Sequence, residues 1–172
     1  MSQGVLSSAP DEEAAVDYYD VIQPINGNAS YDGDFAAWAF DQARRLRALK
    51  SNDIDIDNVA EEIESLGKGE VNKLESFLRL ILLHLLKWDN QPSHRSKSWA
   101  QSISTHRRHA AKQLRKNPSL KAVLDEAVED AYDLAVGDAV RETGLSEKRF
   151  PETSPYNFDT IMNRELRLDD PE

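Results

Sequence analysis

Cysteine is absent from this sequence, and glycine and proline are scarce, with seven residues of each among 172. A chain without cysteine forms neither disulfide bonds nor cysteine-ligated zinc sites. So little glycine and proline argues against a β-sandwich and excludes a collagen-like chain. Phosphate-binding loops, dinucleotide fingerprints and the HExxH zinc motif are also missing. The sequence therefore favours a protein without catalytic activity, although it leaves an enzyme open.

Long apolar runs are missing as well. Residues 1–17 have neither the basic start nor the apolar stretch of a signal peptide. The longest apolar segment, residues 77–86, contains Arg79 and His84 and has about half the length of a membrane span. With 30% charged residues and a net charge of -10, we expect a cytoplasmic protein that stays out of membranes and needs no cofactor.

Helical periodicity begins near residue 34, where apolar side chains start to recur every three or four positions. No segment shows the alternation of a strand, and Gly67 with Gly69 predicts a stop or kink near 67–70. The sequence predicts an all-α fold, an antiparallel bundle of about five main helices with a short C-terminal helix. The predicted ranges are 34–50, 56–67, 70–88, 93–117, 118–143 and, for the short helix, 157–165.

Residues 1–30 differ from the rest, because they contain Pro10, Pro24 and Gly27 and show no sustained period. We expect them to form a flexible N-terminal arm, although the segment 18–22 could dock locally. The helical domain is expected to cover residues 31–168.

Charge is distributed unevenly along the chain. Residues 91–117 include no acidic residue and carry +7, which leaves -17 for the rest of a chain with a total of -10. At about 100° per residue, four of these cations share the helix face opposite Trp99 and Ile103. They are Lys97, Arg108, Lys112 and Arg115. The next predicted helix carries an acidic face on the side opposite its own apolar stripe. This acidic face is formed by Glu126, Glu129, Asp130 and Asp133.

Three interpretations of the basic face are open. It could be a solvated surface, which is the usual role of a run of charge. It could dock an acidic protein partner, including the acidic face of a second copy in self-association. It could also bind nucleic acid weakly through the helix at 94–116, but this is disfavoured because there is no helix-turn-helix pattern and no aromatic residue among the exposed cations.

His84 lies in the most apolar predicted helix, where a buried imidazole needs a hydrogen-bond partner. Glu61, Glu62 and Glu64 lie on the preceding predicted helix and could face it. A structural pair, such as Glu62 with His84, is favoured, and a metal-binding or hydrolytic site inside the bundle is the alternative. The Glu-x-x-His spacing of known bundle sites is absent.

A second pair of histidines, His106 and His109, has a spacing that could share a metal ion. No carboxylate lies nearby in the sequence to complete the ligand shell, so no metal site is predicted there.

Five short motifs occur in order along the chain: EEIESLG at 61–67, HLLKW at 84–88, QPSHRSKSW at 91–99, NPSL at 117–120 and ETGL at 142–145. The sequence resembles the bacterial domain of unknown function twenty-nine family in these motifs. The resemblance covers about 31–168, including DFAAW at 34–38 and FPETSPY at 150–156, and implies an all-helical domain without an assigned activity. Residues that match the motifs, with no role attached, are Glu62, Gly67, His84, Trp88, Arg95 and Trp99. His84, Trp88 and Trp99 flank the turn at 90–93, so a polar site, if one exists, is expected at that junction.

Overall fold

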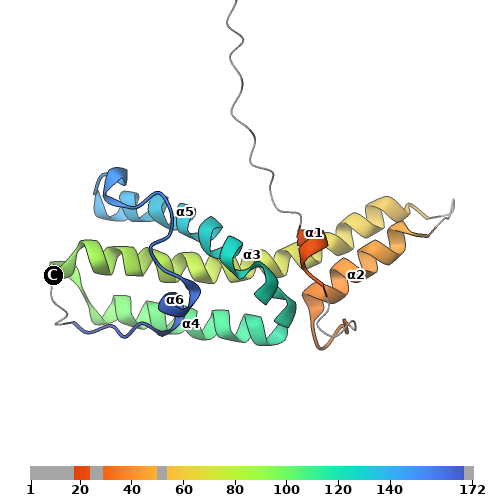
Figure 1. Cartoon of the computed structure of the whole chain (residues 1–172), viewed down its shortest axis with the longest axis horizontal. Helices are drawn as coiled ribbons and strands as arrows, with labels where there is room; N and C mark the ends of the chain where they lie inside the picture. The colour runs from red at the N-terminus through yellow and green to blue at the C-terminus, as the bar shows by residue number, and fades with distance from the viewer. Residues whose placement is uncertain (1–17, 24–28, 50–53, 169–172) are drawn as a thin grey trace, which may run out of the picture.

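A computed structural model describes residues 18–23, 29–49 and 54–168. These ranges form helices and contain no strand, so the predicted all-α fold is confirmed (Figure 1). Among the described helices, none is both long and apolar enough to cross a bilayer.

The spine of the molecule is α3 (Ile56–Asn90), a single helix of 35 residues. The side chain of Asp55 caps its start by accepting a hydrogen bond from the amide of Asn58. α2 (Phe35–Arg47) packs against the first half of α3, while α4 (Lys97–Lys116) and α5 (Leu124–Thr143) pack against the second half (Figure 1). Consecutive long helices run antiparallel, so α5 runs in the same direction as α3.

The predicted stop at 67–70 is wrong, because α3 continues through both glycines. Gly67 faces the ring of Phe40 on α2, and a Cβ at this position would lie 2.8 Å from the ring atom Cε2. Gly67 therefore permits close packing of α2 on α3 and does not end a helix. Around Gly69 a Cβ would meet nothing within 4 Å.

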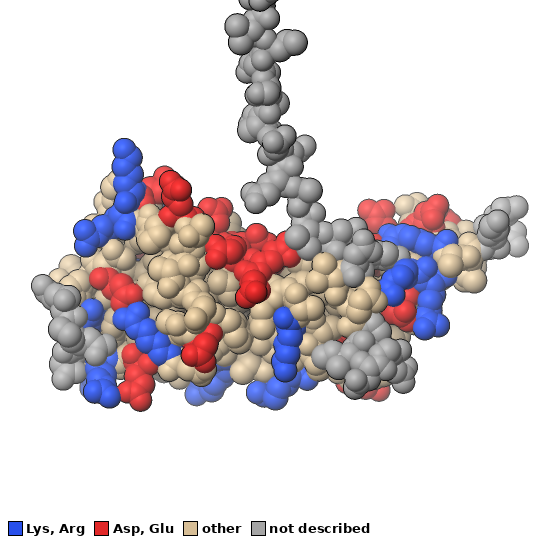
Figure 2. Space-filling model, in the orientation of Figure 1, with Lys and Arg blue, Asp and Glu red and all other residues tan. Residues whose placement is uncertain are grey.

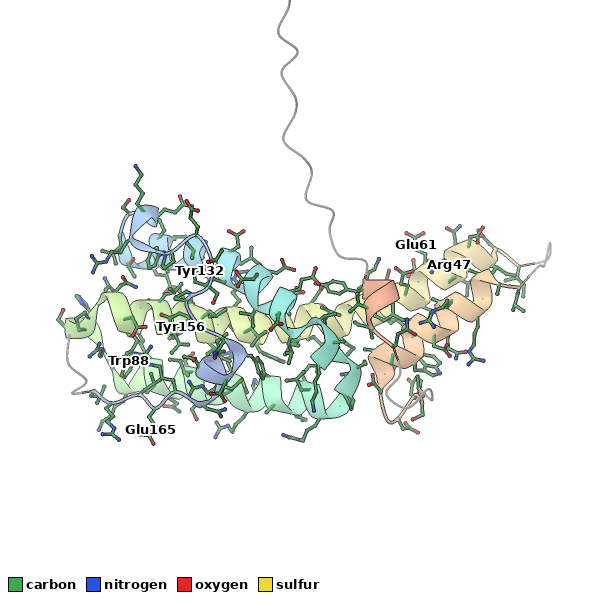
Figure 3. The ribbon with its side chains drawn as sticks, viewed as in Figure 1. Arg47, Glu61, Trp88, Tyr132, Tyr156 and Glu165 are labelled. Carbon is green, nitrogen blue, oxygen red and sulfur yellow. The ribbon has the colours of Figure 1, made fainter. Side chains whose placement is uncertain are left out.

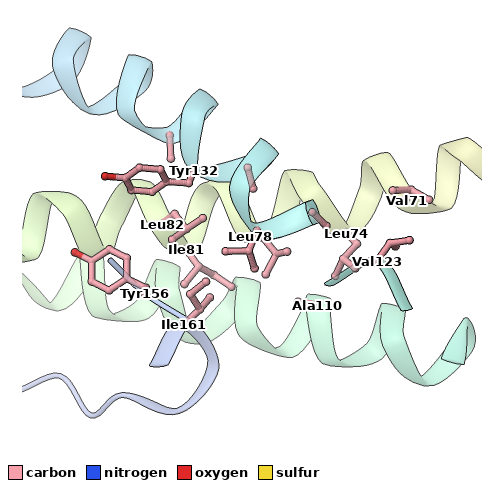
Figure 4. Packing of buried hydrophobic residues seen from close by; sticks show 14 of the residues in the cluster. Val71, Leu74, Leu78, Ile81, Leu82, Ala110, Val123, Tyr132, Tyr156 and Ile161 are labelled. Atoms are coloured by element: carbon pink, nitrogen blue, oxygen red, sulfur yellow. The ribbon is translucent and has the colours of Figure 1, made fainter. Parts of the chain in front are cut away.

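The core forms where α3 is apolar nearly all round, as the sequence predicts for a surrounded helix. Leu74, Leu78, Ile81 and Leu82 are fully buried there (Figure 4). The short α6 (Phe158–Asn163) contributes the buried Ile161 and lies between α4 and α5 (Figures 1 and 4).

Short elements complete the fold. The 3-10 turns η2 (Pro92–His94), η3 (Pro118–Val123) and η4 (Glu147–Arg149) connect the long helices and the C-terminal segment. Gly144 ends α5 with a φ of 71°, a left-handed conformation that favours glycine and makes it the predicted C-cap.

Part of the predicted N-terminal arm is packed on the domain. α1 (Tyr18–Val21) precedes Ile22, which is fully buried. The hydroxyl of Tyr18 donates a hydrogen bond to Glu75 Oε1 at 2.9 Å. The segment 18–22 therefore docks locally, which was the second possibility for this stretch. The rest of the predicted arm, residues 1–17 and 24–28, lies outside the described residues.

Candidate interaction surface

The predicted pairing of Glu62 with His84 is wrong. Both residues lie on the uninterrupted α3, 22 positions apart, which corresponds to about 33 Å along the helix axis. Glu61 and Glu62 are exposed, and Figure 3 shows Glu61 at the opposite end of the molecule from Trp88. The buried Glu64 forms ion pairs with Arg47 and Lys68.

His84 is half-buried, and its Nδ1 donates a hydrogen bond to the backbone oxygen of Leu80 at 2.9 Å. Burial lowers the pKa of His84, which opposes the effect of this hydrogen bond. The nearby charged or titratable groups are Lys87, Glu142 and His106. Within the described residues, no group of three or more His, Asp or Glu side chains is placed to hold a metal ion. The imidazole is thus satisfied by its own helix and does not need the predicted carboxylate.

Trp88, near the end of α3, and Trp99, in the first turn of α4, lie on either side of the 91–96 turn, and each lies near a cation. Trp88 is fully buried. Arg95 donates a hydrogen bond from Nε to the backbone oxygen of Trp88 at 3.0 Å, and its guanidinium lies 5.7 Å from the centre of the Trp88 ring. Lys87 Nζ lies 4.6 Å from the ring centre of Trp99 and forms an ion pair with Glu142. These contacts hold the 91–96 turn against α3, so the geometry gives the junction a structural role.

A buried polar network, missed by the sequence analysis, joins the DFAAW and NPSL motifs. Asp34 caps α2 by accepting from the amide of Ala37, and it also accepts from the amide of Ser119 at 2.7 Å and from its hydroxyl at 2.8 Å. In return, Asn117 Oδ1 accepts from the amide of Ala36 at 3.0 Å. Each helical start therefore receives an acceptor from the other, across more than 80 residues of chain.

The FPETSPY motif belongs to a second polar cluster, which fastens the C-terminal segment. The hydroxyl of Tyr156 donates to Asp89 at 2.7 Å, and Arg164 forms a two-point ion pair with the same carboxylate. Burial by itself would raise the pKa of Asp89, but the hydrogen bonds from Arg164 and Tyr156 outweigh it and lower the pKa. This cluster, like the capping network, stabilises the fold.

The basic face predicted on α4 is exposed, as expected. In Figure 2, Lys and Arg side chains gather along the lower edge of the molecule. The four predicted cations and the neighbouring Lys116 are exposed and form no ion pair with the described part of the chain, so the basic face comprises five side chains. They are Lys97, Arg108, Lys112, Arg115 and Lys116. Among the residues that the structure describes, the guanidinium of Arg108 has only the hydroxyl of Thr105 as a hydrogen-bond partner.

Two of the seven cations in residues 91–117 turn inward. Arg95 packs on Trp88, and Arg107 donates to the backbone oxygens of Ile161 and Arg164 at the end of α6. Burial lowers the pKa of Arg107. These two arginines are used by the fold, which leaves the five others available on the surface.

An open groove with a volume of about 420 Å³ runs beside the basic face, between α3 and α4. Its apolar part is Phe77, whose ring lies 5.2 Å from that of His109, and Lys112 and Lys116 form its edge. The carboxylate in the groove, Glu70, is already held by Lys73, Gln113 and Asn117. The groove thus offers a partner an aromatic surface next to available cations.

The acidic face of α5 lies elsewhere on the surface, over the beginning of that helix, where red side chains gather in Figure 2. Glu129, Asp130 and Asp133 are exposed, and Glu126 is half-buried. Asp130 accepts a hydrogen bond from Tyr18 at 3.4 Å, and Glu129 accepts one from the amide of Ser154 at 3.2 Å.

A family model described as domain of unknown function DUF29 matches residues 30–166. The comparison with curated proteins found no match. Among solved structures, an alpha-helical protein of unknown function from Rhodospirillum rubrum is similar in fold, with a TM-score of 0.57 and 21% identity. The similarity covers 83% of this chain and 94% of that one. Neither the family description nor the name of the similar protein states an activity.

Proposed function

The chain belongs to the DUF29 family, which its description leaves without a function, and we propose that this member is a protein-interaction module whose basic face binds an acidic surface of a protein partner. The observation that carries the proposal is the contrast between two groups of cations on one helix. Arg95 and Arg107 are used inside the fold, whereas the five cations of the basic face have no ion pair within the described residues. Complementary charge of this kind steers association and selects partners.

The groove beside the basic face supports the same function. Charged contacts on a surface contribute little affinity by themselves, since exposed ion pairs are worth about 0–1 kcal/mol each. Phe77, whose ring packs at a tilt against that of His109, supplies the apolar contact that a docked segment needs in addition. An acidic segment that places one apolar side chain against Phe77 would satisfy both features.

A protein partner is favoured over nucleic acid because of the rest of the surface. The basic face is confined to α4, and the remainder of the chain carries -17. A polyanion that extends beyond α4 would therefore be repelled, whereas a short acidic segment would remain on the cations. We also propose a cytosolic location for the module.

We do not propose a metal-binding or hydrolytic site at His84. Glu61 and Glu62, the carboxylates that would complete it, lie about 33 Å away along α3.

Charge reversal on the basic face tests the proposal. Arg108→Glu with Arg115→Glu should abolish capture of protein partners while leaving the helical circular dichroism unchanged. The matched control is Lys121→Glu with Lys148→Glu, two exposed lysines outside the basic face, which alters the net charge by the same amount. Loss of the same partners in both double variants, or in neither, would refute a role for the basic face. A salt titration with single-stranded and double-stranded DNA and RNA of mixed sequence separates the nucleic-acid alternative, which predicts binding at low salt.

A further inference from the structure

We propose that a second copy of this chain is a partner of the basic face, which docks on the acidic face of α5 in the next copy. This inference rests on the proposed function, and it names the partner. The two faces would join successive copies head to tail.

The spacing of the charges matches between the two faces. Arg108, Lys112 and Arg115 occupy positions i, i+4 and i+7 of α4. Glu126, Asp130 and Asp133 occupy the same positions of α5. Residues at this spacing form one straight stripe on a helix, so two such helices lying side by side bring the opposite charges together in register.

The two stripes do not meet within one molecule. α4 and α5 both bury their apolar sides against α3, and α6 lies between them (Figure 1). In Figure 2 the cations of α4 lie along the lower edge of the molecule, whereas the acidic side chains gather above its middle. The complementary faces can therefore meet only between copies.

Gly137 and Leu134 extend the acidic face by one turn. Contacts within the described chain explain neither the glycine inside a helix nor the exposed leucine. Gly137 is exposed in the interior of α5, where glycine is less favourable than alanine, and a Cβ there would meet nothing within 4 Å. No packing among the described residues therefore requires a glycine at this position. Leu134 is 50% exposed beside it. A neighbouring helix that approaches closely would account for both, because glycine allows a short distance between the helices and leucine would be covered by the contact.

The arrangement of the faces determines the kind of assembly. The two faces lie on different sides of the molecule (Figure 2), so a pair of copies joined by one such contact leaves one basic face and one acidic face unused. Such a contact continues until it closes into a ring or forms an open chain. The mass should therefore increase with concentration beyond that of a dimer and fall at high salt, because the contacts are charged.

The test uses neutral variants of similar shape, each of which removes one face. Arg108→Gln, Lys112→Gln and Arg115→Gln remove the basic stripe, and Glu126→Gln, Asp130→Asn and Asp133→Asn remove the acidic stripe. By light scattering and sedimentation, the wild type should exceed the dimer mass at low salt. The association constant of each triple variant alone should be at least about tenfold lower than that of the wild type, which corresponds to roughly 1.4 kcal/mol. An equimolar mixture should reach the dimer mass and stop, since only one working pair of faces remains.

A glycine substitution gives a second measurement. Gly137→Ala should raise the melting temperature and weaken self-association, whereas Gly69→Ala should raise the melting temperature and leave self-association unchanged. A wild-type protein that stays monomeric at low salt up to high concentration would overturn the inference, and so would a mixture of the two triple variants that stays monomeric. If the monomeric protein still loses its captured partners on Arg108→Glu with Arg115→Glu, the proposed function stands and only the second copy is excluded.

Discussion

Replacing Gly67 with alanine should destabilise the protein, whereas the same substitution at Gly69, two residues further along α3, should stabilise it. A Cβ at Gly67 would lie 2.8, 3.0 and 3.2 Å from three ring atoms of Phe40. The Phe40 ring is fully buried, so it cannot move away without disturbing its own packing. At Gly69 a Cβ would meet nothing within 4 Å.

The magnitudes follow from two opposing effects. Alanine is favoured over glycine inside a helix by about 1 kcal/mol. Forcing an extra carbon into a packed core costs about 1–3 kcal/mol. Gly67→Ala should therefore lower the free energy of unfolding by up to about 2 kcal/mol, and Gly69→Ala should raise it by about 1 kcal/mol.

Urea unfolding followed by circular dichroism measures both variants under identical conditions. Combining Gly67→Ala with Phe40→Leu tests the cause, because the smaller side chain makes room for the methyl group and should reduce the penalty of the alanine. If Gly67→Ala stabilises the protein as much as Gly69→Ala does, the glycine is not required by Phe40, and its assignment to helix packing is incorrect.

Three further predictions concern the polar groups of the fold. Asp34→Ala should lower the free energy of unfolding by about 2–4 kcal/mol, since it removes a helix cap and leaves the buried Ser119 amide without its acceptor, and urea unfolding measures this loss. Tyr156→Phe should lower the free energy of unfolding by about 1 kcal/mol at neutral pH. The pKa of Asp89 is lowered in the folded state, so the stability that this carboxylate contributes is present above about pH 4 and disappears as the pH falls through its folded pKa. The effect of Tyr156→Phe should therefore become smaller over the same pH range, as measured by acid unfolding of both proteins. Burial lowers the pKa of His84, so on acidification the unfolded chain takes up the proton first and the stability of the wild type decreases below about pH 6.5. His84→Gln should therefore reduce the pH dependence of the melting temperature between about pH 5 and 7. Melting temperatures that change equally with pH in wild type and variant would contradict this.

Helical periodicity predicted where the long helices lie, because a helix buried on one face has an apolar residue at every third or fourth position. It could not predict that α3 is continuous. Glycine inside a helix can mark an end or a close contact, and what decides between them is Phe40, which lies 27 positions earlier in the chain. The incorrect pairing of Glu62 with His84 followed from that break, since it required the two residues to lie on separate helices.

The candidate surface was predictable to the extent that it depends on one helix. The positions of Arg108, Lys112 and Arg115 on one face follow from helix geometry, and the structure confirms that they are exposed. That Arg107 turns inward was not predictable, because its acceptors are the backbone oxygens of Ile161 and Arg164 at the far end of the chain. The groove beside the face was missed for the same reason, since α3 and α4 both contribute to it.

The exchange of caps between Asp34 and Asn117 has a consequence for synthesis on the ribosome. Chains grow at about 5–20 residues per second, so Asp34 emerges roughly 4–17 s before Ser119, which follows it by 85 residues. During that interval the amide of Ala36 has no Asn117 to accept its hydrogen bond. α2 is therefore synthesised early but completed late, and residues near its start are accessible to chaperones and proteases until the beginning of η3 has left the ribosome.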